Sequence, residues 1–195
     1  MTRRIKFRRG TDAQRLALKL SPGEPFYVLK TTECYIGNGS TKGGIFPGRT
    51  VFAPVDAETV IAVGDLLWFD TDDAKPASMQ ADQGSELANQ TEIAAGFLGI
   101  ALEASPAGST TPIAVATSGI IEYPCVEASY TIGDLVGGKE QNDGKTLYNQ
   151  KVAWVQTAQQ AIGRVAESKA SATTILMLFV STVMHGGVFG SHPGA

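Results

Sequence analysis

The sequence predicts a mainly β protein. A small N-terminal strand-helix-hairpin module precedes a β-barrel or β-sandwich-like domain with an internal pseudo-repeat and extended termini. Glycine and proline together make up 31 of the 195 residues (22 plus 9), a content typical of loop-rich β proteins. Short apolar runs separated by Gly, Asp, Asn and Pro clusters are typical of strands joined by turns. The same order of runs occurs twice along the chain, which predicts the repeat.

The internal repeat consists of three segments that recur in the same order. Each copy has a Gly-Asp-Leu turn entering an apolar strand, an apolar-Gly-x-apolar segment, and a final apolar strand. A Gly-Asp pair supplies a positive φ angle and a side chain that caps the turn. Two copies are too few for a solenoid, so we expect one β domain with pseudo-symmetry. The segments are 64–69, 97–103 and 112–117 in the first copy, and 133–136, 161–167 and 174–180 in the second.

Charge divides the chain into a basic head and an acidic body. Residues 1–50 hold ten Lys or Arg and three Asp or Glu, a net +7, and residues 51–195 hold the remaining six and sixteen, a net −10. This polarity favours directional association with a partner or between subunits, and two solvated surfaces are the alternative. The predicted regions are a basic N-terminal module at 1–50, a β-barrel-like domain at 51–183 and a flexible Gly-rich C-terminal arm at 184–195.

Short local patterns predict the elements of the N-terminal module. Residues 3–9 alternate apolar and basic side chains, as a strand with one apolar and one basic face does. Thr11 is a suitable N-cap for a helix over 12–20, with Asp12 near its positive end. Two strands and a tight turn are then expected at 26–29, 33–36 and 37–39.

The first 45 residues carry a set of motifs: Ile5-Lys6-Phe7-Arg8-Arg9-Gly10-Thr11, then Gly23-Glu24 and Tyr27, then Tyr35-Ile36-Gly37-Asn38-Gly39-Ser40-Thr41. They resemble a small module at the N-termini of tailed-phage fibre and hyaluronidase-like proteins. In that module the last motif is Ile-Gly-Asp-Gly-x-Thr, so Asn38 replaces the usual Asp, and Thr31-Thr32 stands where a Thr-Asp-Thr-Gly turn is common. The resemblance implies a structural or attachment element. The catalytic region of hyaluronidases has no counterpart in this sequence.

The body has its own ordered motifs: Gly64-Asp65-Leu66, the segment 97–101, the strand 113–117 ending in Ser118-Gly119, and Gly133-Asp134-Leu135-Val136. Their order is similar to that of small β-barrel decoration, or cement, proteins of phage heads. The resemblance implies a non-enzymatic virion protein that binds the outer surface of a phage capsid and bridges neighbouring capsomers. It also implies two partners, the major capsid protein and further copies of this chain in a homotrimer. The expected location is the capsid exterior, and the host cytoplasm during assembly.

The segments between strands are polar. Residues 44–62 are predicted to connect the module to the body. Residues 70–90 form an unusually long predicted loop, which is typical of a mobile or contacting surface, and 85–95 is a possible short helix. Residues 139–145 form a second predicted loop.

Sequence features place the chain in a soluble, reducing environment. The two cysteines, Cys34 and Cys125, lie far apart in sequence, and reduced, packed thiols are expected for assembly in a cytoplasm. The N-terminal stretch lacks the apolar core of a secretory signal, and the chain has no run near the roughly 20 apolar residues of a membrane span.

No group of residues in the sequence predicts a cofactor, a metal or an active site. Residues 37–43 superficially resemble a phosphate loop, but Lys42 follows Thr41 and a turn is favoured. The acidic run 70–73 lacks the pattern of a calcium loop, so a solvated loop is favoured. His185 and His192 lie in the predicted arm without an acidic or thiol partner nearby. The sequence leaves open a pair of carboxylates that cleaves sugars, and such a hydrolase would require a pocket with convergent polar groups.

The candidate partner-binding residues lie at the two ends of the chain. The N-terminal basic strand could grip an acidic protein surface, and a solvated strand face is equally consistent with the pattern. No nucleic-acid motif accompanies the basic strand, and the acidic body would repel a polyanion, so direct nucleic-acid binding is not expected. A tail-fibre or baseplate component that binds a host receptor is the alternative function. The candidate residues are Arg3, Arg4, Lys6, Arg8, Arg9, Val188 and Phe189.

Overall fold

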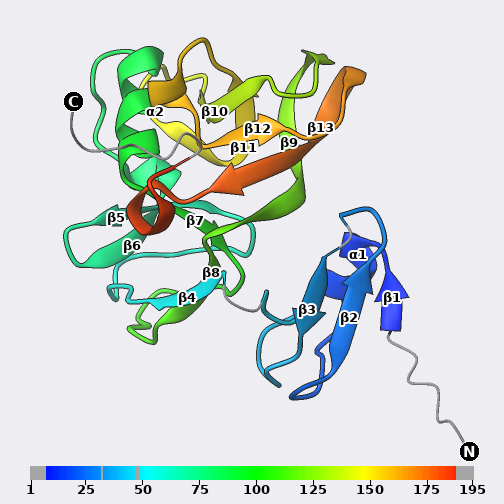
Figure 1. Ribbon diagram of the computed structural model, residues 1–195. Coiled ribbons are helices and arrows are strands. Elements are labelled where there is room, and N and C mark those ends of the chain that lie inside the picture. Colours follow the sequence, from blue (N-terminus) through cyan, green and yellow to red (C-terminus); the bar gives the residue numbers. More distant parts are fainter. Residues whose placement is uncertain (1–7, 32, 47–48, 188–195) are drawn as a thin grey trace, which may run out of the picture. The chain divides into compact units, whose positions relative to one another are not determined.

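The computed structural model describes residues 8–31, 33–46 and 49–187 (Figure 1). The chain divides into two compact units, Met1–Thr50 and Val51–Ala195. This division falls at the same position as the boundary predicted between residues 50 and 51. The predicted strand residues 3–7 and arm residues 188–195 lie outside the described residues.

The first unit is a three-stranded sheet with one short helix, as the strand-helix-hairpin prediction requires. The sheet has the order β1-β2-β3, with β1 parallel to β2 and β2 antiparallel to β3. Leu20, Phe26, Val28 and Tyr35 form its small core. The elements are β1 (Arg8–Gly10), α1 (Asp12–Leu16), β2 (Pro25–Val28) and β3 (Cys34–Ile36).

Helix α1 begins where the sequence predicts but ends four residues early. Thr11 caps it with a complete capping box, in which Gln14 donates its backbone N–H to the Thr11 hydroxyl and accepts the Thr11 N–H. The predicted end at residue 20 is wrong because the following residues pair with a distant segment. Gly43 donates its N–H to the Leu18 carbonyl, and Lys19 forms a bridge with Lys42.

The second unit begins with a five-stranded sheet, which we call repeat 1. Its strands follow the order β4-β8-β7-β5-β6. A hydrogen bond of 2.9 Å from the Ala74 N–H on β6 to the Pro54 carbonyl, just after β4, joins the two edges of this sheet. The elements are β4 (Thr50–Ala53), β5 (Leu66–Asp70), β6 (Asp73–Pro76), η1 (Ala77–Met79), α2 (Glu86–Ala95), β7 (Phe97–Ala101) and β8 (Ile113–Ala116).

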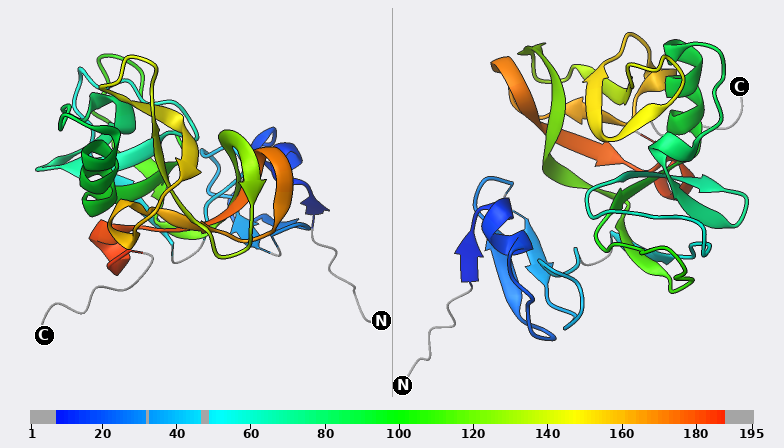
Figure 2. Two further views of the ribbon diagram at one scale, coloured as in Figure 1. Left: turned by 90° about the horizontal axis from the view of Figure 1, so that it is seen from above. Right: turned by 180° about the vertical axis from the view of Figure 1, so that it is seen from behind.

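The next five strands form a closed barrel, repeat 2, with the order β10-β11-β9-β13-β12. Because the barrel is closed, its order can be read from any strand. Read from β9 it is β9-β13-β12-β10-β11, which is the order of repeat 1, β4-β8-β7-β5-β6, with five added to each strand number. The long strands β9 and β13 run side by side and curve together (Figure 2). The elements are β9 (Ser118–Tyr130), β10 (Leu135–Glu140), β11 (Leu147–Trp154), η2 (Ala158–Gln160), β12 (Gly163–Val165), β13 (Lys169–Val180) and then α3 (Thr182–His185).

The predicted pseudo-repeat is confirmed by the hydrogen bonds of the two Gly-Asp turns. Gly64 and Gly133 both have φ 93°. Gly64 N–H donates to the Ala101 carbonyl, and Gly133 N–H donates to the Val165 carbonyl, each at 2.8 Å. The aspartate that follows each glycine accepts a backbone N–H from three residues before it, at 2.8 Å in repeat 1 and 2.7 Å in repeat 2. The two turns therefore make equivalent hydrogen bonds in both repeats.

The apolar-Gly-x-apolar motif of each repeat has a steric reason. A Cβ atom on Gly99 would collide with the Ala116 carbonyl oxygen, and one on Gly163 would lie 2.7 Å from the Leu178 carbonyl oxygen. Ala116 and Leu178 occupy equivalent positions, because each pairs with the residue directly after its glycine. The motif thus marks the place where two strand backbones approach too closely for a side chain.

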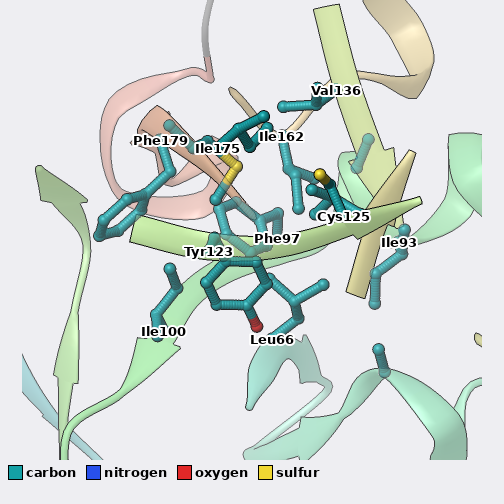
Figure 3. Packing of buried hydrophobic residues seen from close by; sticks show 14 of the residues in the cluster. Leu66, Ile93, Phe97, Ile100, Tyr123, Cys125, Val136, Ile162, Ile175 and Phe179 are labelled. Carbon is teal, nitrogen blue, oxygen red and sulfur yellow. The ribbon is translucent and has the colours of Figure 1, made fainter. Parts of the chain in front are cut away.

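Each repeat has apolar residues at the same core positions. Leu67, Ala101 and Val115 belong to the core of repeat 1. Their counterparts Val136, Val165 and Met177 belong to a larger core that also includes helix α2 and one face of repeat 1. Figure 3 shows Leu66, Phe97 and Tyr123 close together within this larger core. The two repeats are therefore fused through a shared apolar layer.

The predicted loop over 70–90 is mostly structured. It contains β6, which pairs with β5, and η1. Ala74 and Pro76 are buried, while Asp73 and Lys75 are polar. This polar composition is the reason that the sequence did not predict a strand there. The predicted short helix is confirmed as α2, and Ser85 caps it by accepting the Ala88 N–H at 3.2 Å.

Candidate binding surfaces

The basic strand is described only at its end. Arg8 and Arg9 lie on β1 with exposed side chains, and Arg8 forms an ion pair of 3.1 Å with Glu24. Since the Arg8 side chain is 51% exposed, this pair contributes little stability. The other candidate residues, Arg3, Arg4, Lys6, Val188 and Phe189, lie outside the described residues.

Among the described residues of the first unit, Arg15 is the most deeply buried cation, and no sequence motif pointed to it. Its guanidinium forms an ion pair with the Asp12 carboxylate at 2.6 Å and donates to the Gly43 carbonyl at 3.0 Å. It also lies 3.7 Å from the centre of the Tyr35 ring. Burial raises the pKa of the Tyr35 hydroxyl above its usual range. Because Arg15 is 1% exposed, this cluster is closed to ligands, and loss of either partner would leave the other charge buried and unpaired.

A surface groove of about 410 Å³ lies in the second unit, beside helix α2. Its apolar residues include Trp154 on β11 and Leu87 on α2, which are 56% and 58% exposed. Val126 on β9 and Gln160 on η2 also line it. Exposed aromatic and aliphatic side chains in a concave surface are typical of binding sites.

Side-chain amides hold α2 beside this groove. Gln90 donates to the Gly138 carbonyl at 3.0 Å and accepts from Gln160 at 2.6 Å. Asn89 donates to Glu140 at 2.9 Å and to the Lys145 carbonyl at 3.1 Å. Side-chain amides do not titrate near neutral pH, so these groups hold the helix in place but cannot act as general acids or bases.

An ion pair is part of the groove lining. Lys139 contacts Glu86 at 2.7 Å, and both side chains are partly exposed. The lining therefore combines apolar side chains, one of them aromatic, with a pair of opposite charges. It is suited to binding a ligand with both apolar and polar surface.

The segments weighed for phosphate and metal chemistry are turns. Asn38 accepts the N–H groups of Ser40 and Thr41 at 3.0 and 2.8 Å, which closes a turn that no helix follows. Asp70 binds Lys75 at 2.6 Å, and this hydrogen bond raises the pKa of the Lys75 ammonium. Within the described ranges, no cluster of three His, Cys, Asp or Glu side chains could hold a metal ion.

His185 is ordered, contrary to the expectation that the arm begins at residue 184. It ends α3, and its Nε2 lies 3.0 Å from the Thr117 hydroxyl. The preceding residues fix this helix to repeat 1, because Ser181 donates to the Phe97 carbonyl at 3.0 Å and Thr182 to the Ala94 carbonyl at 2.6 Å. Ser181 was the signal for this element, since it also caps the helix by accepting the Met184 N–H. His192 lies outside the described residues.

The two cysteines are free and belong to different units. Cys34 is half-buried in β3, and Cys125 is buried in β9. Burial raises the pKa of the Cys125 thiol. A raised pKa reduces the thiolate fraction and therefore the nucleophilicity of this sulfur.

No protein-family model matches the sequence, and a search of curated proteins gives no match either. Within the part of the chain that the structure describes, no helix is long and apolar enough to cross a membrane.

Proposed function

We propose that this chain is a non-enzymatic structural protein of a tailed-phage virion. It binds the outer surface of the capsid and bridges neighbouring capsomers, so that the shell resists the internal pressure of packaged DNA. The division of charge between two separately folded units carries this proposal, with +7 on residues 1–50 and −10 on residues 51–195. Two units of opposite charge can bind partner surfaces of different charge, and this charge complementarity sets the orientation of binding.

The second unit, a five-stranded sheet fused to a closed barrel, suits the role of a rigid spacer. Its two repeats share the larger apolar core, so they resist movement relative to each other. The C-terminal segment starts from α3, which Ser181 and Thr182 fix to the body. A contact made by that segment would therefore transmit force to the barrels. Many modest contacts, repeated over a shell, add through avidity.

The proposed partners are the major capsid protein and further copies of this chain, with a homotrimer as the expected assembly. Neither a membrane nor nucleic acid is a proposed partner, and the proposed location is the capsid exterior. The basic segment with Arg3, Arg4, Lys6, Arg8 and Arg9, and the C-terminal pair Val188 and Phe189, are the proposed capsid contacts.

A binding assay with purified capsid shells tests this function. Shells lacking the protein are incubated with the full chain, and attachment is measured by co-sedimentation and by electron microscopy. Deleting 1–7 or 188–195 leaves every described element intact, so we expect normal folding and weakened attachment. Failure of the full chain to bind shells would refute the proposal. Full attachment of both deletion variants would instead transfer the contact to the barrels.

A fibre or baseplate component that binds a host receptor is the second candidate, and the groove beside Trp154 favours it. This function predicts that the chain binds whole host cells and that Trp154→Ala abolishes binding. Ile132→Ala is the matched control, because Ile132 is 65% exposed and does not line the groove. Binding to shells but not to cells would exclude this alternative.

A further inference from the structure

Asn38 is the one asparagine of the chain that a glycine follows. The other three, Asn89, Asn142 and Asn149, precede glutamine or aspartate. An asparagine loses its amide when the backbone nitrogen of the next residue attacks the side-chain Cγ atom and ammonia leaves. A glycine in that next position leaves the nitrogen open to approach, because it has no Cβ atom to crowd the reaction. The sequence therefore makes Asn38 the amide of the chain that is most open to this attack.

The turn holds the Asn38 side chain against the backbone that follows it. The Oδ1 atom accepts the N–H groups of Ser40 at 3.0 Å and of Thr41 at 2.8 Å. The Nδ2 atom donates to the Thr41 hydroxyl at 2.7 Å. Gly39 lies between these residues with φ 81°, a conformation that glycine adopts without strain. The Cγ atom that is attacked and the nitrogen that attacks thus belong to one closed turn.

The same hydrogen bonds suit the carboxylate that would replace the amide. A carboxylate accepts N–H groups more strongly than an amide oxygen does, because the bonds are charge-assisted. The Thr41 hydroxyl accepts a hydrogen bond from the amide nitrogen, and it can turn to donate to a carboxylate oxygen instead. Exposed Lys42 and the net +7 of residues 1–50 also favour a negative charge in this turn. Each of the three hydrogen bonds therefore has a counterpart in the product.

We propose that Asn38 is a modification site, at which the folded protein converts asparagine to aspartate. The Gly39 nitrogen gives its proton to solvent and bonds to Asn38 Cγ, the Cγ–Nδ2 bond breaks, and the amide nitrogen takes up a proton and leaves as ammonia. Water then adds to Cγ of the cyclic imide, which breaks the new C–N bond and returns a proton to the Gly39 nitrogen. The net reaction consumes one water and releases one ammonia, and nothing is oxidised or reduced.

The turn also selects between the two products of the imide. Water that adds at Cγ gives aspartate, whereas water that adds at the main-chain carbonyl carbon gives isoaspartate, whose main chain is one carbon longer. The longer main chain would separate the carboxylate from the N–H groups of Ser40 and Thr41. We therefore expect aspartate in the folded protein and mainly isoaspartate in the unfolded chain. This assignment does not depend on attachment to a capsid.

Ageing of the full chain, followed by peptide mapping with mass spectrometry, tests this site. The exchange of an amide nitrogen for an oxygen changes the mass of the peptide, and chromatography separates aspartate from isoaspartate. We expect Asn38 to be converted roughly tenfold faster or more than Asn142, which is exposed but precedes an aspartate. The Asp143→Gly variant places a glycine after Asn142 as the matched control. Conversion there should yield mainly isoaspartate, because the exposed side chain is not held as Asn38 is.

The Asn38→Asp variant isolates the effect of the product on the turn. Backbone amide exchange of the first unit should slow about fivefold, because charge-assisted hydrogen bonds replace neutral ones. Ser40→Asp is the matched control, since it adds the same charge to the same turn at an exposed side chain. Its exchange rate should equal that of the wild type.

Three results would overturn the proposal. The first is an Asn38 amide that stays intact in the folded protein but is lost in urea, which would show that the turn protects it. The second is a ratio of aspartate to isoaspartate at Asn38 that equals the ratio at Asn142 in the Asp143→Gly variant. The third is an Asn38→Asp variant whose first unit exchanges as fast as that of Ser40→Asp.

Discussion

Substitution of Gly99 by alanine provides the sharpest test of how the repeats are built. The added Cβ would collide with the Ala116 carbonyl oxygen, a backbone atom that cannot rotate away. Gly99 also has φ 151°, a conformation that side-chain-bearing residues avoid. Overpacking costs about 1–3 kcal/mol, and the strained φ angle adds about 1–3 kcal/mol. We therefore expect the free energy of unfolding to fall by roughly 2–6 kcal/mol, a large part of the stability of an ordinary domain.

Three other glycines separate these two causes. Gly163 has only the steric conflict, with its added Cβ 2.7 Å from the Leu178 carbonyl oxygen, and should lose about 1–3 kcal/mol. Gly108 has only the positive φ angle of 84°, with nothing within 4 Å of the added Cβ, and should lose about 1–2 kcal/mol. Gly96 has neither, since its nearest atom lies at 3.6 Å, so alanine there should be neutral or stabilise by up to about 1 kcal/mol.

Urea unfolding followed by tryptophan fluorescence measures these changes in the second unit alone. Trp68 and Trp154 are the two tryptophans of the chain, and both lie in that unit. The midpoint should shift in the order Gly96, Gly108, Gly163, Gly99, with an unchanged slope. A Gly99→Ala variant as stable as Gly96→Ala would refute the close approach of β7 and β8.

Three further predictions concern the buried polar groups. Arg15→Met should destabilise the first unit by about 3–5 kcal/mol, because it leaves the buried Asp12 carboxylate unpaired. Arg9→Met is the control and should leave the stability unchanged, since Arg9 is exposed. Backbone amide exchange measures the stability of both variants. Asn89→Ala should lower the stability of the second unit by about 1–3 kcal/mol relative to exposed Glu92→Ala, as shown by tryptophan fluorescence, since it removes the hydrogen bonds that hold α2. Burial raises the pKa of Tyr123 well above its usual range, so its contribution to stability should be complete below about pH 10 and be lost as the pH rises from there toward the folded value. Alkaline titration followed by tyrosinate absorbance should therefore show Tyr123 ionising together with unfolding, and ionisation of every tyrosine in the folded protein near pH 10 would contradict it.

The pseudo-repeat explains how one chain obtains a rigid body from a five-stranded sheet and a small barrel. Each repeat alone has few apolar core positions, and a domain of this size is only marginally stable. Fusion lets the outer face of repeat 1, with Leu66 and Ile100, become part of the core of the whole unit. The cost is an apolar face at the free side of repeat 2, where Leu178 is exposed.

The sequence by itself determined the features that local contacts stabilise. Thr11 and Ser85 cap helices within three residues of themselves, and the Gly64-Asp65 turn closes through a hydrogen bond over the same short span. Such signals are readable because donor and acceptor are close in sequence.

Tertiary structure alone decided the features that depend on distant residues. Strand β6 is recognisable only through its pairing with β5, and α1 ends early because Leu18 and Lys19 pair with residues 42–43. Strand pairing also shows that Ile100 and Arg164 hold the same place in the two repeats. Burial depends on how the layers pack. Ile100 is buried because it packs against residues of β9 and β13, which are distant in the chain. Arg164 is not part of this buried cluster in the described part of the molecule.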